Sequence, residues 1–171
     1  MQSIPARALF MACFHGDAAA VSRLLPAGGT PLDLSGPRFQ HPDHQKSTPL
    51  IVAAEGGHTD IVRMILERAP KTAVDYKDVI HASALLMAAL YHRADTIRVL
   101  VDRGANVNLV GQQRATPLRC AVGPTNPGET ARLPDPDGER QVAVVVALLR
   151  LDAGSSPPHP AHTPYAHPPP S

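Results

Sequence analysis

The chain has 171 residues, of which 43 % are hydrophobic and 18 % are charged, so it has the size and composition of one folded domain. Its formal net charge of +1 provides no strong field to attract nucleic acid or an anionic membrane, and we expect neither as a partner. The longest apolar run, residues 142–149, is too short to cross a bilayer, and the N-terminus lacks a signal-peptide pattern. We therefore expect a soluble cytoplasmic protein, with the nucleus as the alternative location.

Four segments of the chain resemble one another when the sequence is aligned with itself. Thr48-Pro49-Leu50 recurs as Thr116-Pro117-Leu118, with Ser83-Ala84-Leu85 between them and Arg7-Ala8-Leu9 near the start. The four leucines are separated by 41, 35 and 33 residues. A period near 33 with short insertions is typical of a repeat protein in which each unit is a pair of helices.

The repeat pattern predicts antiparallel helix pairs along the first 122 residues. We expect helices at 7–14 and 17–25, at 48–56 and 58–68, at 83–91 and 95–103, and at the start of a fourth unit from Thr116. Residues 31–47 carry the extra length between the first two units and include several prolines, which predicts an extended surface loop.

The second unit shows why these residues should form a helix. Thr48 can cap the free N–H groups at a helix start, and Pro49 loses no hydrogen bond in the first helical position. Leu50, Ala53 and Ala54 then share one face, where the small alanines allow neighbouring helices to approach closely.

A second helix of the same unit should follow directly. Gly57 can adopt the left-handed conformation that ends the first helix. The apolar residues of the second helix are Ile61, Val62, Met64, Ile65 and Leu66. Neither helix can bury its apolar face alone, so stability must come from stacking against the next unit.

The last third of the chain departs from the pattern. Residues 123–140 are rich in proline and charge, which predicts a disordered insertion. A helix closing the fourth unit is expected within 141–154. Residues 155–171 should form a disordered Pro/His-rich tail; it could be an SH3 or WW ligand, but proline bias alone makes a linker the favoured interpretation.

These segments resemble the ankyrin repeat. The resemblance is carried by TPLIVAAEGGHTDIVRMILERA (48–69) and SALLMAALYHRADTIRVLVDRGANVN (83–108), and more weakly by ALFMACFHGDAAAVSRLLPAGG (8–29). It implies an all-α ankyrin-repeat solenoid of about four helix-turn-helix repeats, with repeats 1–3 and the start of repeat 4 in residues 6–122.

The resemblance also implies a function: ankyrin stacks bind other proteins on their concave side, which the inner helices and turn tips form. The register places these residues there: Met11, Phe14, His15, Val52, Glu55, Gly56, Met87, Leu90, Tyr91 and Cys120. We expect Phe14, His15, Glu55, Met87, Leu90 and Tyr91 to contact a partner protein or peptide. The alternative is that the inserts or a further repeat cover this apolar strip.

Two other functions remain open at this point. The N-terminal stack is similar to that of Fem-type substrate receptors of cullin-RING ubiquitin ligases, through features such as Thr116-Pro117-Leu118-Arg119. This resemblance would imply ubiquitin-ligase components as partners, although the insertion at 123–140 replaces a pocket segment of that family. The chain could also be a structural spacer, or a fragment of a longer ankyrin protein.

The sequence gives little indication of catalysis or metal binding. His41-Pro42-Asp43-His44 is the densest histidine group, but it lacks the closely paired Cys and His ligands of a zinc site. Cys13 and Cys120 lie three repeats apart, too far for a disulfide, and occupy positions where small residues pack. No phosphate loop or catalytic triad can be assembled. We therefore expect a non-catalytic protein without metal or cofactor.

Overall fold

The computed structural model describes residues 6–25, 34, 47–122 and 144–150, and the structural statements below concern those residues. Within them the regular elements are helices, together with an isolated antiparallel bridge between Lys77 and Ser83. The insertion at 123–140 and the tail at 155–171 lie outside the described residues.

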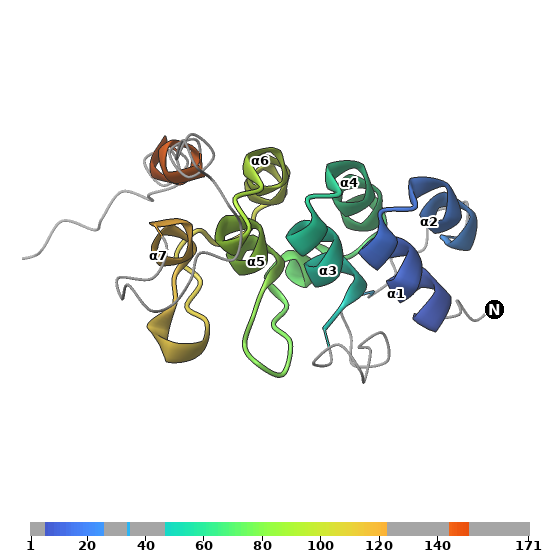
Figure 1. The fold of residues 1–171 in the computed structure, drawn as a ribbon, viewed down its shortest axis with the longest axis horizontal. Coiled ribbons are helices and arrows are strands. Elements are labelled where there is room, and N and C mark those ends of the chain that lie inside the picture. Colours follow the sequence, from blue (N-terminus) through green and yellow to red (C-terminus); the bar gives the residue numbers. More distant parts are fainter. Residues whose placement is uncertain (1–5, 26–33, 35–46, 123–143, 151–171) are drawn as a thin grey trace, which may run out of the picture.

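The helices form a stack of antiparallel pairs (Figure 1). The named elements are α1 (Ala6–His15), α2 (Ala18–Leu24), α3 (Pro49–Gly56), α4 (Thr59–Arg68), η2 (Lys71–Asp75), α5 (Ala84–Leu90), α6 (Ala94–Asp102), η3 (Gln112–Arg114) and α7 (Pro117–Val122). The inner helices α1, α3, α5 and α7 form one layer, and α2, α4 and α6 form the other (Figure 1). Residues 144–150 are helical and continue the outer layer beside α6. The predicted all-α repeat stack is confirmed.

The inner helices begin as the sequence predicts. The Thr48 hydroxyl oxygen accepts a hydrogen bond from the Ile51 N–H at 3.3 Å, and Pro49 is the first residue of α3. Ser83 caps α5 in the same way, with its hydroxyl accepting from the Leu86 N–H at 3.3 Å. Each cap satisfies an N–H group that has no partner within its own helix.

The core follows the leucine and alanine positions of the repeat. Leu50, Ala53 and Ala54 are buried in the second repeat, as are the corresponding Leu85, Ala88 and Ala89 in the third. The outer helices contribute the apolar side chains Ile61, Val62, Ile65, Leu66, Ile97 and Leu100. Because each inner helix is covered by the next, one continuous core runs along the stack.

Leu34, which lies between the first two repeats, is part of this core. Leu34 is fully buried and belongs to the same apolar cluster as α1 and α3. The expectation of a surface loop over residues 31–47 was therefore wrong at Leu34, because a leucine that reaches apolar neighbours gains more from burial than from exposure.

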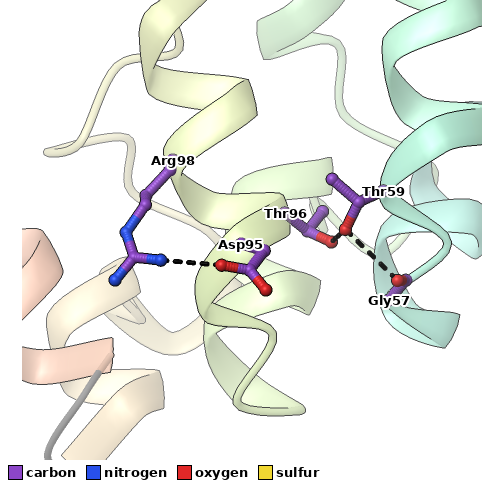
Figure 2. Close-up of polar contacts among 5 residues, drawn as sticks. All are labelled: Gly57, Thr59, Asp95, Thr96 and Arg98. Atoms are coloured by element: carbon purple, nitrogen blue, oxygen red, sulfur yellow. Dashed lines mark hydrogen bonds and ion pairs between the residues drawn. The ribbon is translucent and has the colours of Figure 1, made fainter.

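Polar contacts link the outer helices where they begin (Figure 2). The hydroxyl oxygens of Thr59 and Thr96 lie 2.9 Å apart, and the Thr59 hydroxyl also donates to the Gly57 carbonyl at 3.3 Å. Thr96 is buried, so this hydrogen bond satisfies a polar group that would otherwise be costly to bury. It holds neighbouring repeats in register.

The inner helices end at a left-handed residue. Gly16 and Gly57 have φ of +75° and +76° at equivalent positions, as predicted for Gly57. His92 occupies this position in the third repeat with φ of +54°. Its ring Nε2 lies 3.2 Å from the Ala121 carbonyl of the next repeat, a contact that helps to hold a conformation rarely adopted by residues other than glycine.

The side chains that follow these turns pack onto the preceding repeat. The His58 ring lies against two glycines: a Cβ atom would lie only 2.5 Å from it at Gly16, and the same distance from it at Gly56. Arg93 corresponds to His58 in the next repeat. Its Nε donates to the Glu55 carbonyl at 3.1 Å. Residues without a Cβ atom are therefore required at the turns on which these side chains rest.

Candidate functional site

The inner-helix face carries the predicted site residues at repeating positions. Phe14, Glu55 and Leu90 each follow the repeat leucine by five residues, and His15, Gly56 and Tyr91 follow it by six. Because α1 packs against α3 and α3 against α5, each set forms a row across the stack. The rows lie at the C-terminal ends of the inner helices.

The first repeat contributes the most exposed of these side chains. Phe14 is 41 % exposed, which is unusual for a phenylalanine, and His15 is also exposed. Their rings pack edge to face with centroids 5.2 Å apart. This contact limits the rotation of the phenyl ring and presents an aromatic surface to solvent.

The third repeat contributes side chains that are half-buried. Leu90 and Tyr91 are partly exposed at the end of α5, and Met87 is partly exposed while it packs against the core. Glu55 is partly exposed at the end of α3. The six predicted residues thus lie on one face, and their contact with a partner stays a prediction.

One residue expected to be exposed on this face is buried. Val52 is only 5 % exposed, whereas Met11 and Met87 at the same repeat position are partly exposed. The neighbours α1 and α5 cover α3 from both sides, and a valine is too short to extend past them. Val52 therefore belongs to the core, and the expectation that it faces solvent was wrong. Cys120, at the same position in the fourth repeat, is partly exposed.

A projecting turn precedes α5 on the opposite edge of this face (Figure 1). Lys77 pairs with Ser83 across it, and the Asp78 carboxylate accepts hydrogen bonds from the N–H groups of Ile80 and Ala82 at 3.0 and 2.9 Å. Burial raises the pKa of Asp78, and these two N–H groups and the nearby charge of His81 oppose the rise. The carboxylate thus fixes the shape of the turn.

The tip of this turn exposes apolar residues that had no place among the predicted site residues. Val79 and Ile80 are 51 % and 37 % exposed there, and Val110, which precedes the next such turn, is 46 % exposed. The Lys77 ammonium donates to the Val110 carbonyl at 2.7 Å and joins the two turns. The sequence signal that could have located this tip was Asp78 followed by two apolar residues, since an aspartate often closes such a turn.

Both cysteines are free thiols. Burial raises the pKa of the Cys13 thiol to about 12, so the reactive thiolate is scarce at neutral pH. Burial also raises the pKa of Cys120, and the charge of Arg119 opposes that rise. Neither environment favours a nucleophile.

The part of the chain that the structure describes contains no cluster of three or more His, Cys, Asp or Glu side chains suited to a metal ion. The histidine group at 41–44 lies outside that part. Among the described helices, none has the length and hydrophobicity needed to cross a membrane.

Comparison with known families gives a match over most of the stack. The family model for ankyrin repeats, in three copies, matches residues 9–111. This range contains α1 to α6 almost completely, and it includes every predicted partner-binding residue.

Comparison with known proteins gives relatives that share the repeats. A mouse protein, ankyrin repeat and SAM domain-containing protein 6, is 31 % identical over 121 residues, which cover 69 % of this chain and 12 % of that protein. The Drosophila melanogaster transient receptor potential cation channel subfamily A member 1 is 29 % identical over 91 residues, covering 52 % of this chain and 8 % of the channel. This chain therefore spans about an eighth or less of these relatives. The similarities give no support to the narrower resemblance to Fem-type receptors.

Proposed function

Since the chain belongs to the ankyrin-repeat family, we propose that it is a non-catalytic interaction module that binds a segment of another protein on its inner-helix face. The observation that carries the proposal is the row formed by Phe14, Glu55 and Leu90, with Tyr91 beside it. Large apolar and aromatic side chains that remain partly exposed on a rigid scaffold are typical centres of protein interfaces.

The chemistry of the row indicates the kind of segment that would fit. Phe14 and Leu90 are apolar, and Glu55 lies between them as the contribution of the middle repeat. A complementary segment would carry two apolar side chains with a lysine or arginine between them. The carboxylate of Glu55 would then face a cation. Burial of this carboxylate against an apolar group would leave its charge without a partner, which is costly.

The spacing of the helices limits the length of this segment. Neighbouring packed helices lie roughly 8–10 Å apart, so Phe14 and Leu90, two helices apart, are about 16–20 Å from each other. An extended chain advances about 3.3 Å per residue, so about five or six residues separate the two apolar anchors of the partner.

Truncation of the third-repeat anchors should separate binding from folding. We expect the double substitution Leu90→Ala and Tyr91→Ala to weaken binding of the partner segment at least about thirtyfold, because hot-spot truncations typically cost about 2 kcal/mol or more. Thermal stability should fall only modestly, since both side chains are already partly exposed. Isothermal titration and thermal unfolding of the same preparations measure the two quantities.

The matched control is Val99→Ala with Val101→Ala, which truncates two partly exposed side chains on the outer helix of the same repeat. This control should bind as the wild type does. Unchanged binding by the Leu90/Tyr91 variant would place the interaction elsewhere, for example on the turn tips. A sharp loss of thermal stability would instead show that these two residues serve the core.

The charge of the middle position gives a second test, which does not require the partner to be identified. We expect selection of random dodecapeptides displayed on phage to enrich sequences with a basic residue between two apolar residues. The same selection on Glu55→Lys should enrich an acidic residue at that position, because the partner charge must now be reversed.

Asp102→Lys is the control for this selection, since Asp102 is exposed at the end of an outer helix. It should enrich the same peptides as the wild type. Equal charge preferences of the wild type and the Glu55→Lys variant would contradict the proposed contact, and an absence of any enriched peptide would contradict binding of short extended segments.

A further inference from the structure

Two turns project from the same edge of the stack, one over residues 77–83 before α5 and the other before α7 (Figure 1). The Lys77 ammonium donates to the Val110 carbonyl at 2.7 Å and joins them. They also approach closely at a second point, since a Cβ atom on Gly111 would lie only 3.0 Å from the His81 carbonyl. The two turns are therefore packed together and present one surface.

The charges on these turns are mainly positive. Within residues 77–83 and 109–119 the cations are Lys77, Arg114 and Arg119, and the acidic residue is Asp78. Asp78 is 6 % exposed, and its carboxylate accepts hydrogen bonds from two N–H groups of its own turn. In the part of the chain that the structure describes, no ion pair involves these three cations. Their charge is thus available to a carboxylate from another molecule.

Apolar side chains lie on the same turns as these cations. Val79, Ile80 and Val110 are 51 %, 37 % and 46 % exposed. His81 and Arg114 are exposed beside them, and Arg119 is bound to the second turn because its guanidinium donates to the Gln113 carbonyl at 3.5 Å. We call this apolar and basic area the turn surface: Val79, Ile80, His81, Val110, Arg114 and Arg119.

The backbone is strained at two residues of the turn surface. His81 has φ of +57° and Arg114 has φ of +58°, and Gln113 beside Arg114 has φ of +53°. This left-handed conformation is unfavourable for residues with a Cβ atom, whereas glycine adopts it freely. Strained residues of this kind cluster at ligand-binding sites. Position 114 therefore carries an arginine where the turn alone would favour glycine.

We propose that the turn surface binds an acidic segment of a partner protein, in which carboxylates lie beside one or two apolar side chains. The apolar side chains would cover Val79, Ile80 and Val110, and the carboxylates would pair with Arg114 and Arg119. Arginine suits this role because its planar guanidinium can donate two parallel hydrogen bonds to one carboxylate. Complementary charge selects such a segment against neutral or basic ones.

The turn surface differs from the inner-helix rows in place and in charge. The rows lie at the C-terminal ends of the inner helices, whereas the two turns precede the N-terminal ends of α5 and α7. The middle of the first row is Glu55, which favours a basic segment, while the turn surface favours an acidic one. The two sites therefore require peptides of opposite charge, and either proposal can fail without the other.

The test begins with selection of random dodecapeptides displayed on phage, using the full chain with Leu90→Ala and Tyr91→Ala to remove the large side chains of the rows in the third repeat. We expect enrichment of peptides that combine Asp or Glu with aliphatic or aromatic residues. The most enriched peptide, labelled with fluorescein, should bind the wild type equally well, and less tightly as salt increases. Enrichment without an acidic preference would overturn the proposal, and so would an absence of enriched peptides.

Charge reversal then locates the binding site of the labelled peptide. Arg114→Glu should weaken its binding at least about tenfold, measured by fluorescence anisotropy. Arg63→Glu is the matched control, because Arg63 is an exposed arginine on the outer helix α4. This control should bind as the wild type does. Equal weakening by both variants would show an effect of net charge alone and would overturn the proposal.

Two glycine variants separate the arginine side chain from the shape of the turn. Neither Arg114→Gly nor Gln113→Gly should lower the thermal midpoint, because glycine adopts the left-handed conformation without strain. Only Arg114→Gly should weaken peptide binding, at least about tenfold, since Gln113→Gly keeps every cation of the turn surface. Equal binding by the two variants would overturn the proposal, because it would show that the guanidinium makes no contact with the peptide.

Discussion

Replacement of Leu85 by alanine should lower the free energy of unfolding by about 3 kcal/mol, the largest effect that we expect from one substitution. Leu85 is completely buried in the middle of the stack, where α5 packs against α3, α6 and α7. The cavity left by the missing side chain would weaken the contacts of the third repeat on both sides. Since each repeat is stabilised by its neighbours, the loss should spread to the whole stack.

Leu118→Ala is the matched control, because it removes the same side chain at the same repeat position. Leu118 is 37 % exposed, so the cost should be below about 1 kcal/mol. Urea unfolding followed by circular dichroism measures both variants. Equal destabilisation would show that the two leucines are buried alike in solution, which would contradict the exposure of Leu118 on α7.

Replacement of Gly16 by alanine should lower the free energy of unfolding by about 2–3 kcal/mol. Part of this cost comes from φ of +75°, a left-handed conformation that costs a residue with a Cβ atom roughly 1–2 kcal/mol. The rest comes from the His58 ring, which would lie 2.5 Å from the new methyl group. The ring must move, and the contact between the first two repeats must change with it.

Two further variants separate these causes. Gly104 has φ of +91° with no atom near its missing Cβ, so Gly104→Ala should show the conformational cost alone, about 1 kcal/mol. In a His58→Ala background, Gly16→Ala should then cost no more than Gly104→Ala does. Chemical denaturation of the single and double variants gives the coupling energy. Absence of coupling between positions 16 and 58 would contradict the packing of the ring on the turn.

The starts and ends of the helices could be predicted from the sequence because they depend on local chemistry. Thr48 and Ser83 cap their helices through hydrogen bonds to residues three positions ahead, and Gly57 ends α3 with its own backbone conformation. His92 shows the limit of this reasoning, since a histidine holds the left-handed position that glycine takes in two other repeats. Its contact with Ala121 comes from the next repeat.

The position of the candidate site could be predicted from the sequence, but the exposure of its side chains could be predicted less well. The repeat period places Phe14, Glu55 and Leu90 in one row, because residues at equal repeat positions on stacked helices must lie side by side. The period alone cannot distinguish Val52 from Met87, which differ only in how far each side chain extends between its neighbours.

The sequence by itself determined the fold class, the helix pairs and the face on which the candidate site lies, since these follow from a repeated pattern of capping, glycine and apolar residues. Only the tertiary structure decided which equivalent residues are covered. Leu85 and Leu118 occupy the same position within their repeats, yet Leu85 is buried and Leu118 is exposed. The difference arises because burial depends on the helix that lies next in space. The burial of Leu34 and the exposure of Val79 and Val110 have the same origin.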